Sequence, residues 1–309
     1  MSTAANKAFR MLSLAFMSGK AFHAVFISSP DADEALSLAR RAASLCILGR
    51  DDENAVTQNP DYYFFAGEET GVKEIRPIIE ELSKAAPGGG MRAIVISNAH
   101  AMTRGAQNTI LKTLEEPPKD VIFLLSGHAE GMLSTIVSRC ALVRLGQAGR
   151  AEIEAELIKR GVAQSDARVY AGISGGIMGT AIKLSENEDF RAQRDRSIAA
   201  IIALFNGELQ ANAGKAIAKA GAADGITFML SFTGDILSQS MGGIRQIDNE
   251  DKQDTVRKIA SRFTTRQILC IINKITKAGE SLYRADGGTM YSAAVLDGLF
   301  LSILKELSK

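Results

Sequence analysis

Arg139 is the side chain whose chemistry is easiest to define from the sequence. It stands in Ser138-Arg139-Cys140, between a short helical run that begins at Leu133 and an apolar strand predicted at residues 141–145. Regular structure on both sides fixes the backbone from which the guanidinium extends. A fixed guanidinium offers a planar fork of N–H donors that matches a carboxylate or a phosphate. Two uses stay open, a carboxylate of the same chain or a phosphate across a subunit boundary.

A second group of polar residues lies on the helix predicted between Thr103, a suitable N-cap, and Pro117. Arg104, Asn108 and Lys112 recur every four residues, so they share one face of that helix. The opposite face is apolar and carries Ala106, Ile110, Leu111 and Leu114. The polar face is either solvated or binds a phosphate backbone through Arg104 and the helix N-terminus.

The turn after the first predicted strand, residues 24–27, lacks the residues of a phosphate-binding loop. It reads Ser29-Pro30-Asp31-Ala32-Asp33-Glu34, without a glycine for close approach or a lysine for the phosphates. Its carboxylates favour the helix dipole and repel a polyphosphate. Another strand ends in Ser97-Asn98, where a nucleotide hydrolase carries a magnesium-binding acid. The sequence therefore predicts no nucleotide binding at this loop.

Histidine and cysteine provide no clear metal or nucleophilic site. His100 is either a base or a hydrogen-bonded structural residue, and the second fits better because metal sites need several converging ligands. The three cysteines, Cys46, Cys140 and Cys270, lie far apart and include no C-x-x-C pair. We therefore predict no disulfide framework and no cysteine zinc site, and a reducing, cytoplasmic setting.

The elements that position these residues follow from hydrophobic periodicity. Compact apolar runs predict strands at residues 24–27, 62–65, 93–96, 121–125 and 141–145, separated by helical patterns at residues 5–17, 34–48 and 72–82. Buried strands that alternate with helices predict a parallel sheet covered on both faces. Beyond residue 146 only amphipathic helical stretches remain, with a join near residue 205. The fold class is therefore α/β followed by all-α.

Composition excludes several classes of function. The chain has 309 residues with 36 Lys and Arg against 35 Asp and Glu, so a net charge of +1 gives no overall positive field for nucleic acid. Aromatic residues make up 6% and tryptophan is absent, which argues against a platform that stacks single-stranded bases. No apolar run approaches the roughly 18 residues of a membrane span. Any contact with DNA must be local or shared with other subunits.

Several segments of the sequence resemble the clamp-loader branch of the AAA+ proteins. The resemblance is carried by N-T-I-L-K-T-L-E-E-P-P at residues 108–118, Phe123-Leu124-Leu125, and the S-R-C motif at residues 138–140. Supporting pieces are His23-Ala24, Asn59-Pro60-Asp61, Ile75-Arg76 and Ser174-Gly175-Gly176. It implies an AAA+-like α/β domain with a degenerate nucleotide site at residues 1–146, a small helical lid domain at 147–205, and a C-terminal helical collar domain at 206–309.

The resemblance also implies that this chain does not bind ATP. Its phosphate-loop positions carry Glu34-Ala35-Leu36 in place of Gly, Lys and Thr or Ser, and Ser97-Asn98 replaces the acidic pair of the magnesium motif. Thr180 stands where motor subunits carry a second phosphate-sensing arginine. The family's four-cysteine zinc module is missing, since no cysteine follows Cys46 before residue 59. The resemblance therefore implies that this chain binds no cofactor, neither ATP nor zinc.

In this family the arginine of S-R-C acts in trans on ATP held by a neighbouring subunit. The resemblance implies that Arg139, with Ser138 and Cys140, serves as this arginine finger, and that the chain is the non-hydrolysing subunit of a DNA polymerase III clamp loader. The expected partners are gamma or tau motor subunits, a delta subunit, the sliding clamp through the complex, and primed DNA. Thr103, Arg104 and Asn108 would contact the DNA backbone without sequence preference.

Two alternatives stay open. The first is an ATP-binding motor subunit, gamma- or tau-like, with an atypical phosphate loop. The second is a scaffold outside replication that retains only the fold. Binding of labelled ATP distinguishes the first, and co-purification with motor subunits distinguishes the second.

Overall fold

The computed structural model describes residues 2–18, 22–82, 90–284 and 288–308. The chain divides into two compact units. The first comprises Met1–Ala148 together with Ile177–Gly179, and the second comprises Gly149–Gly176 and Thr180–Lys309. The further division at residue 205, into a lid and a collar domain, stays a prediction.

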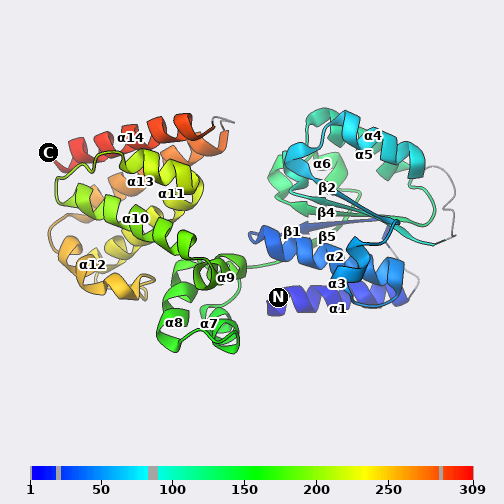
Figure 1. Cartoon of the computed structure of the whole chain (residues 1–309), viewed down its shortest axis with the longest axis horizontal. Coiled ribbons are helices and arrows are strands. Elements are labelled where there is room, and N and C mark those ends of the chain that lie inside the picture. The colour runs from blue at the N-terminus through cyan, green and yellow to red at the C-terminus, as the bar shows by residue number, and fades with distance from the viewer. Residues whose placement is uncertain (1, 19–21, 83–89, 285–287, 309) are drawn as a thin grey trace. The chain divides into compact units, whose positions relative to one another are not determined.

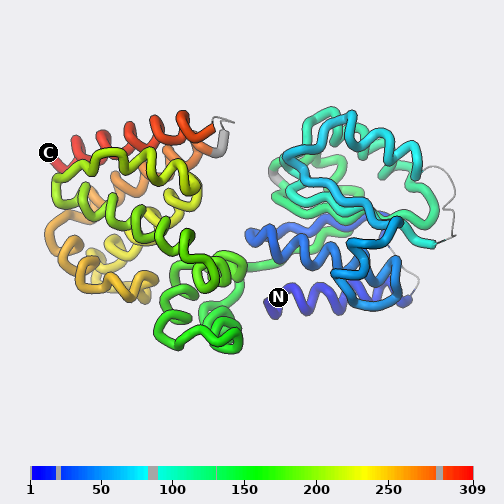
Figure 2. The backbone as a smooth tube through the Cα atoms, in the orientation of Figure 1, coloured from blue at the N-terminus to red at the C-terminus, as the bar shows by residue number. Residues whose placement is uncertain are grey.

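A five-stranded parallel sheet forms the centre of the first unit, which confirms the predicted fold class (Figure 1). The strands are β1 (Ala24–Ser28), β2 (Tyr62–Ala66), β3 (Arg92–Ser97), β4 (Val121–Gly127) and β5 (Ala141–Arg144). Their order in the sheet is β2-β3-β4-β1-β5. β1 lies between two strands from much later in the chain, as the backbone colours show (Figure 2). Phe26 is paired with Leu125 on one side and with Leu142 on the other.

Alternating side chains of the central strands enter two separate cores. Val25 and Leu124 belong to the core on one face, whereas Phe26 and Leu125 belong to the core on the other. One core receives α1 (Thr3–Met17), α2 (Ala32–Leu48) and α3 (Glu53–Thr57). The other receives α4 (Val72–Leu82), α5 (Arg104–Glu115) and α6 (Ser134–Val137). The sheet is therefore covered on both faces, as predicted (Figure 1).

Local capping accounts for the helix boundaries near the site. Asp31 caps α2 by accepting a hydrogen bond from the backbone N–H of Glu34, and the helix ends at Gly49 in the left-handed region with φ of 67°. Thr103 caps α5 by accepting from the N–H of Ala106, which confirms the predicted N-cap. Short 3₁₀ helices occur at Gly67–Glu69, Ala99–Ala101, Ala129–Gly131 and Glu250–Lys252.

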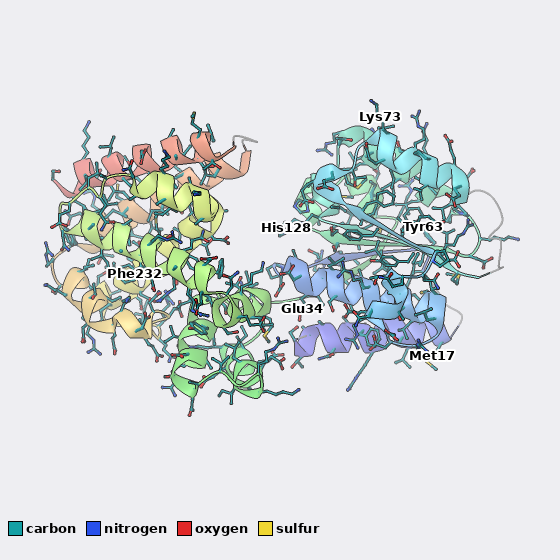
Figure 3. All side chains as sticks on the ribbon, viewed as in Figure 1. Met17, Glu34, Tyr63, Lys73, His128 and Phe232 are labelled. Atoms are coloured by element: carbon teal, nitrogen blue, oxygen red, sulfur yellow. The ribbon has the colours of Figure 1, made fainter. Side chains whose placement is uncertain are left out.

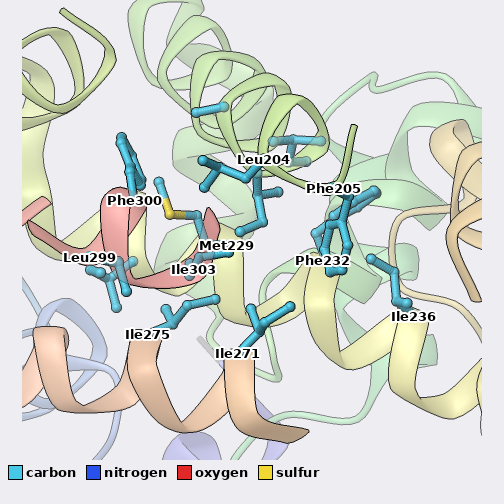
Figure 4. Close-up of a cluster of buried hydrophobic side chains, with 14 of the residues drawn as sticks. Leu204, Phe205, Met229, Phe232, Ile236, Ile271, Ile275, Leu299, Phe300 and Ile303 are labelled. Atoms are coloured by element: carbon cyan, nitrogen blue, oxygen red, sulfur yellow. The ribbon is translucent and has the colours of Figure 1, made fainter. Parts of the chain in front are cut away.

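The described residues of the second unit form helices joined by loops, without a strand. Its helices are α7 (Arg150–Lys159), α8 (Gln164–Ile173), α9 (Met178–Glu186), α10 (Glu188–Phe205), α11 (Ala213–Ser240), α12 (Gln253–Ala260), α13 (Thr265–Arg284) and α14 (Gly288–Leu307). Phe205, Met229, Phe232, Ile271 and Phe300 lie in its main core (Figure 4). No helix among the described residues is both long and apolar enough to cross a membrane.

Candidate functional site

The backbone at Arg139 is held in the way that the sequence predicts. Arg139 lies in a turn between α6 and β5, where its N–H donates to the carbonyl of Ile136 and the next N–H, of Cys140, donates to Val137. Ile136 is fully buried in the core beneath the sheet edge. Because the turn is fixed to a buried residue, the start of the Arg139 side chain has little freedom.

The Arg139 side chain is bound within its own chain. Its Nη1 donates to the carbonyl of Thr135 at 2.9 Å, and its Nη2 donates to Oε1 of Glu115 at 2.9 Å. Of the two uses considered from the sequence, the intramolecular carboxylate is the one present in the single chain. The side chains of Arg139 and Glu115 are nevertheless 35% and 47% exposed. An exposed ion pair contributes only about 0–1 kcal/mol, so this guanidinium can exchange its partner at small cost.

Gln107 connects α5 to the segment that carries Arg139. It is 1% exposed. Its Nε2 donates to the carbonyls of Met102 and Gly131, and its Oε1 accepts from the N–H of Leu133 at 2.9 Å. Sequence reasoning missed this residue. The available signal was a polar side chain one position after Ala106, within the apolar face of a helix. Gln107 thus fixes the start of α6 and, through it, the position of Arg139.

The predicted polar face of α5 is present. Arg104, Asn108 and Lys112 are all exposed, as is Thr103, whose hydroxyl oxygen accepts from the N–H of Ala106 at 3.2 Å. Glu115 follows at the end of the same face. The twelve-residue helix therefore separates the Thr103 end from the Arg139 partner by about 18 Å. A contact between the Thr103 end and DNA stays a prediction.

The turn after β1 contains two buried carboxylates. Asp31 is 5% exposed and Glu34 is 8% exposed. Asp31 Oδ1 accepts from the N–H of Glu34 at 3.1 Å, and its Oδ2 accepts from the N–H of Gly179 at 2.8 Å. Glu34, labelled at the beginning of α2 in Figure 3, accepts from the N–H of Ser2. The acidic residues of this turn therefore have structural partners in the first unit.

The carboxyl ends of β3 and β4 meet at the same edge of the sheet. Asn98 donates through Nδ2 to Oε1 of Glu68 at 2.7 Å. The rings of His100 and His128 lie edge to face, with centroids 4.9 Å apart, and Nδ1 of His100 accepts from the N–H of His128. A Cβ on Gly127 would lie 2.5 Å from that Nδ1. This close packing agrees with the structural interpretation of His100.

The cysteines do not form a reactive or metal-binding cluster in the described part of the chain. Burial raises the pKa of the Cys140 thiol to about 12, and burial raises the pKa of Cys46 in the same way, to about 12. Both thiols are therefore protonated and poorly nucleophilic at neutral pH. Among the described residues, no group of three or more His, Cys, Asp or Glu side chains could hold a metal ion.

Known proteins resemble this chain along most of its length. A family model described as DNA polymerase III, delta subunit, matches residues 4–148, which include α5, α6 and Arg139. The delta' subunit of DNA polymerase III from Escherichia coli is 25% identical over 297 residues, covering 90% of this chain and 88% of that protein. Residues 4–148 thus resemble this family, and most of the chain resembles a delta' subunit. The delta' subunit from Bacillus subtilis is 32% identical over 143 residues, covering 45% of this chain and 43% of that protein.

A solved structure extends the similarity to the fold. A DNA polymerase III gamma subunit-related protein from Thermotoga maritima superposes with a TM-score of 0.50 at 14% identity. The alignment covers 98% of this chain and 99% of that one. At this identity the likeness concerns the fold alone. It agrees with a parallel-sheet domain followed by helices.

Proposed function

We propose that this chain is the non-hydrolysing, delta'-like stator subunit of a DNA polymerase III clamp loader, and that Arg139 is its arginine finger. In this role Arg139 reaches ATP bound by a neighbouring gamma or tau motor subunit. The relatives named as delta' subunits support the identity of the subunit. The position of Arg139, in a fixed turn at the surface with a weakly held guanidinium, supports its role and carries the proposal.

The chemistry of this step is electrostatic. During hydrolysis negative charge develops on the oxygens of the transferred γ-phosphate, and an arginine supplied from outside the site stabilises it. The Arg139 fork now donates to one carbonyl and one carboxylate oxygen. A phosphate can accept from both nitrogens of the fork at once and carries more negative charge. In the complex, Arg139 would exchange Glu115 for the neighbour's phosphate.

The same proposal includes that this chain does not itself bind a nucleotide. Two buried carboxylates, Asp31 and Glu34, lie where a phosphate loop would approach its ligand, and they would repel it. Ser97 and Asn98 offer no carboxylate for magnesium, and Thr180 offers no cation for a γ-phosphate. We therefore propose that the chain carries neither ATP nor zinc.

We expect the isolated chain to show no saturable binding of labelled Mg-ATP up to millimolar concentration. Equilibrium dialysis measures this directly, with an isolated motor subunit as the positive control. Micromolar affinity would instead favour the alternative of an ATP-binding motor with an atypical phosphate loop.

The stator proposal further requires that the chain co-purifies with gamma or tau and delta subunits. Failure to assemble would favour the scaffold alternative.

The proposed partners also include the sliding clamp, through the complex, and the backbone of primed DNA in the bacterial cytoplasm. Thr103, Arg104 and Asn108 would contact phosphates from the N-terminal end of α5. The helical residues 206–309 would form a collar with the other subunits. The net charge of +1 supports a DNA contact that is weak and shared with them.

Replacing Arg104 by alanine is expected to weaken binding of primed DNA by the assembled complex. One lost phosphate contact should lower the slope of log affinity against log salt by about 1 and should do so for any DNA sequence. Fluorescence anisotropy at several salt concentrations measures both quantities. Lys112→Ala is the matched control because it removes a cation from the other end of the same face. An equal loss in both variants would contradict a contact at the Thr103 end.

A further inference from the structure

We propose that α12, α13 and the corner between them form a surface that binds the phosphate backbone of nucleic acid without sequence preference. The surface consists of four exposed cations, Arg257, Lys258, Arg262 and Arg266, and we term it the basic corner. It lies wholly within the second unit. The inference goes beyond the proposed function, because neither Arg139 nor α5 is part of this surface.

Positive charge is concentrated in this part of the chain. Residues 252–277 contain seven Lys and Arg against a single carboxylate, Asp254, whereas the whole chain has a net charge of only +1. Two of the seven, Lys252 and Lys274, have carboxylate partners. Within the described ranges, no carboxylate pairs with any of the four cations of the basic corner. The nearly neutral total therefore conceals a local positive field.

The backbone under the basic corner is fixed. Ile268 is fully buried in the main core of the second unit. Thr264 and Gln267 cap the start of α13 reciprocally, because the N–H of Thr264 donates to Oε1 of Gln267 at 3.0 Å and the N–H of Gln267 donates to Oγ1 of Thr264 at 3.3 Å. Arg262 is held by a hydrogen bond from its Nη1 to Oδ1 of Asn206 at 3.1 Å. The cations therefore extend from a backbone that is already ordered before a ligand binds.

Arg266 is placed where helix stability alone does not favour a cation. It lies in the first turn of α13, at the positive end of the helix dipole, and that turn contains no acidic residue. A cation there raises the free energy of the helix unless an external anion binds beside it. By contrast, Arg257 and Lys258 lie in the last turn of α12, where the dipole favours cations. Arg266 is therefore the residue that indicates an anionic ligand most directly.

The residues between the cations favour a phosphate backbone over an acidic protein segment. Lys258, Arg262 and Arg266 recur every four residues, and the hydroxyl side chains of Ser261 and Thr265 lie between them in sequence. Arginine, lysine and hydroxyl side chains are the groups that contact phosphate oxygens in nucleic-acid complexes. A row of fixed cations also matches a strand that carries one negative charge per phosphate. Such contacts read no bases, so binding should not depend on sequence.

The experiment measures binding of a labelled DNA duplex with a single-stranded extension by the full-length chain, using fluorescence anisotropy over about 50–200 mM salt. The corner variant combines Lys258→Gln, Arg262→Gln and Arg266→Gln. The control removes three exposed cations from α11 and α14 of the same unit, by Lys215→Gln, Lys219→Gln and Lys305→Gln. In the corner variant the slope of log affinity against log salt should fall by about 2–3, because each phosphate contact contributes about 0.7–0.9. The control should keep the slope of the wild type.

Arg266→Gln alone keeps the test decisive if the triple variant does not fold. It should lower the slope by about 0.7–0.9 and leave Tm equal or higher, because it removes a cation from the positive end of α13. An arginine with a purely structural role would instead lower Tm on replacement and leave DNA binding unchanged. That result would overturn the proposal.

Equal losses in the corner variant and the control would also overturn the proposal, because DNA would then respond to net charge alone. So would a corner variant that keeps its affinity for DNA but no longer binds poly-L-glutamate, since the partner would then be an acidic protein segment. The effect of the corner variant should be the same in an Arg104→Ala background, because Arg104 lies in the first unit. Failure of the proposed contact at α5 therefore leaves this test unaffected.

Discussion

Replacing Arg139 by alanine in the reconstituted clamp loader is expected to slow ATP hydrolysis at the adjoining motor site by about 10³-fold or more. The guanidinium would no longer stabilise the charge that develops on the γ-phosphate. The total ATP turnover of the complex should fall by the fraction that this one site contributes. Phosphate release during clamp loading onto primed DNA measures the effect.

Two controls keep this prediction specific. Gel filtration should show that Arg139→Ala assembles normally, because the lost ion pair with Glu115 is exposed and contributes little to stability. Arg139→Lys keeps the charge but not the planar fork, so it should recover only part of the rate. Unchanged turnover in a fully assembled Arg139→Ala complex would count against the arginine finger.

Replacing Asp235 by alanine is expected to destabilise the second unit by about 2–4 kcal/mol. This carboxylate is fully buried in α11. It accepts from Nη2 of Arg245, from the N–H of Asp248, and from both the N–H and Nδ2 of Asn249. Alanine would leave the buried backbone N–H of Asn249 without its acceptor, and Nδ2 of Asn249 would keep only its bond to Oγ of Ser231. Thermal unfolding should show a decrease in Tm of roughly 4–16 °C.

Arg245→Ala separates the ion pair from the rest of this network. The Arg245 side chain is 42% exposed and Asp235 is fully buried, so Arg245→Ala removes the cation from the carboxylate but leaves its three other donors in place. We therefore expect a clearly smaller decrease in Tm than for Asp235→Ala. Equal decreases would mean that the ion pair, and not the bonds to the 248–249 backbone, holds this segment to α11.

The elements of the sheet domain were predictable because their signals are local. The apolar run at residues 93–96 became β3, Arg92–Ser97, and the predicted helix at residues 5–17 became α1, Thr3–Met17. A run of β-branched residues bounded by turns defines a buried strand wherever it occurs. The break in α11 at Gly221, with φ of 125°, was not predicted, because the alanine and lysine spacing around it suits a continuous helix.

The candidate site was predictable only in part, because only some of its features depend on residues that are neighbours in sequence. The fixed turn at Arg139 and the shared face of Arg104 and Asn108 follow from neighbours in sequence. The partner of Arg139 is 24 residues away, at Glu115, and that of Asp31 is 148 residues away, at Gly179. Which carboxylate meets which donor depends on how the helices pack around the sheet, and no local pattern encodes it.

Single-turnover hydrolysis in a complex whose only competent nucleotide site adjoins this chain tests the central claim most directly. Glu115→Ala removes the intramolecular partner but keeps the cation, whereas Arg139→Ala removes the cation itself. We predict that Glu115→Ala hydrolyses ATP within a few-fold of wild type and that Arg139→Ala is slower by about 10³-fold. Equal slowing in both variants would show that Arg139 only braces α5 against α6, and wild-type rates in both would show that it does not act on ATP at all.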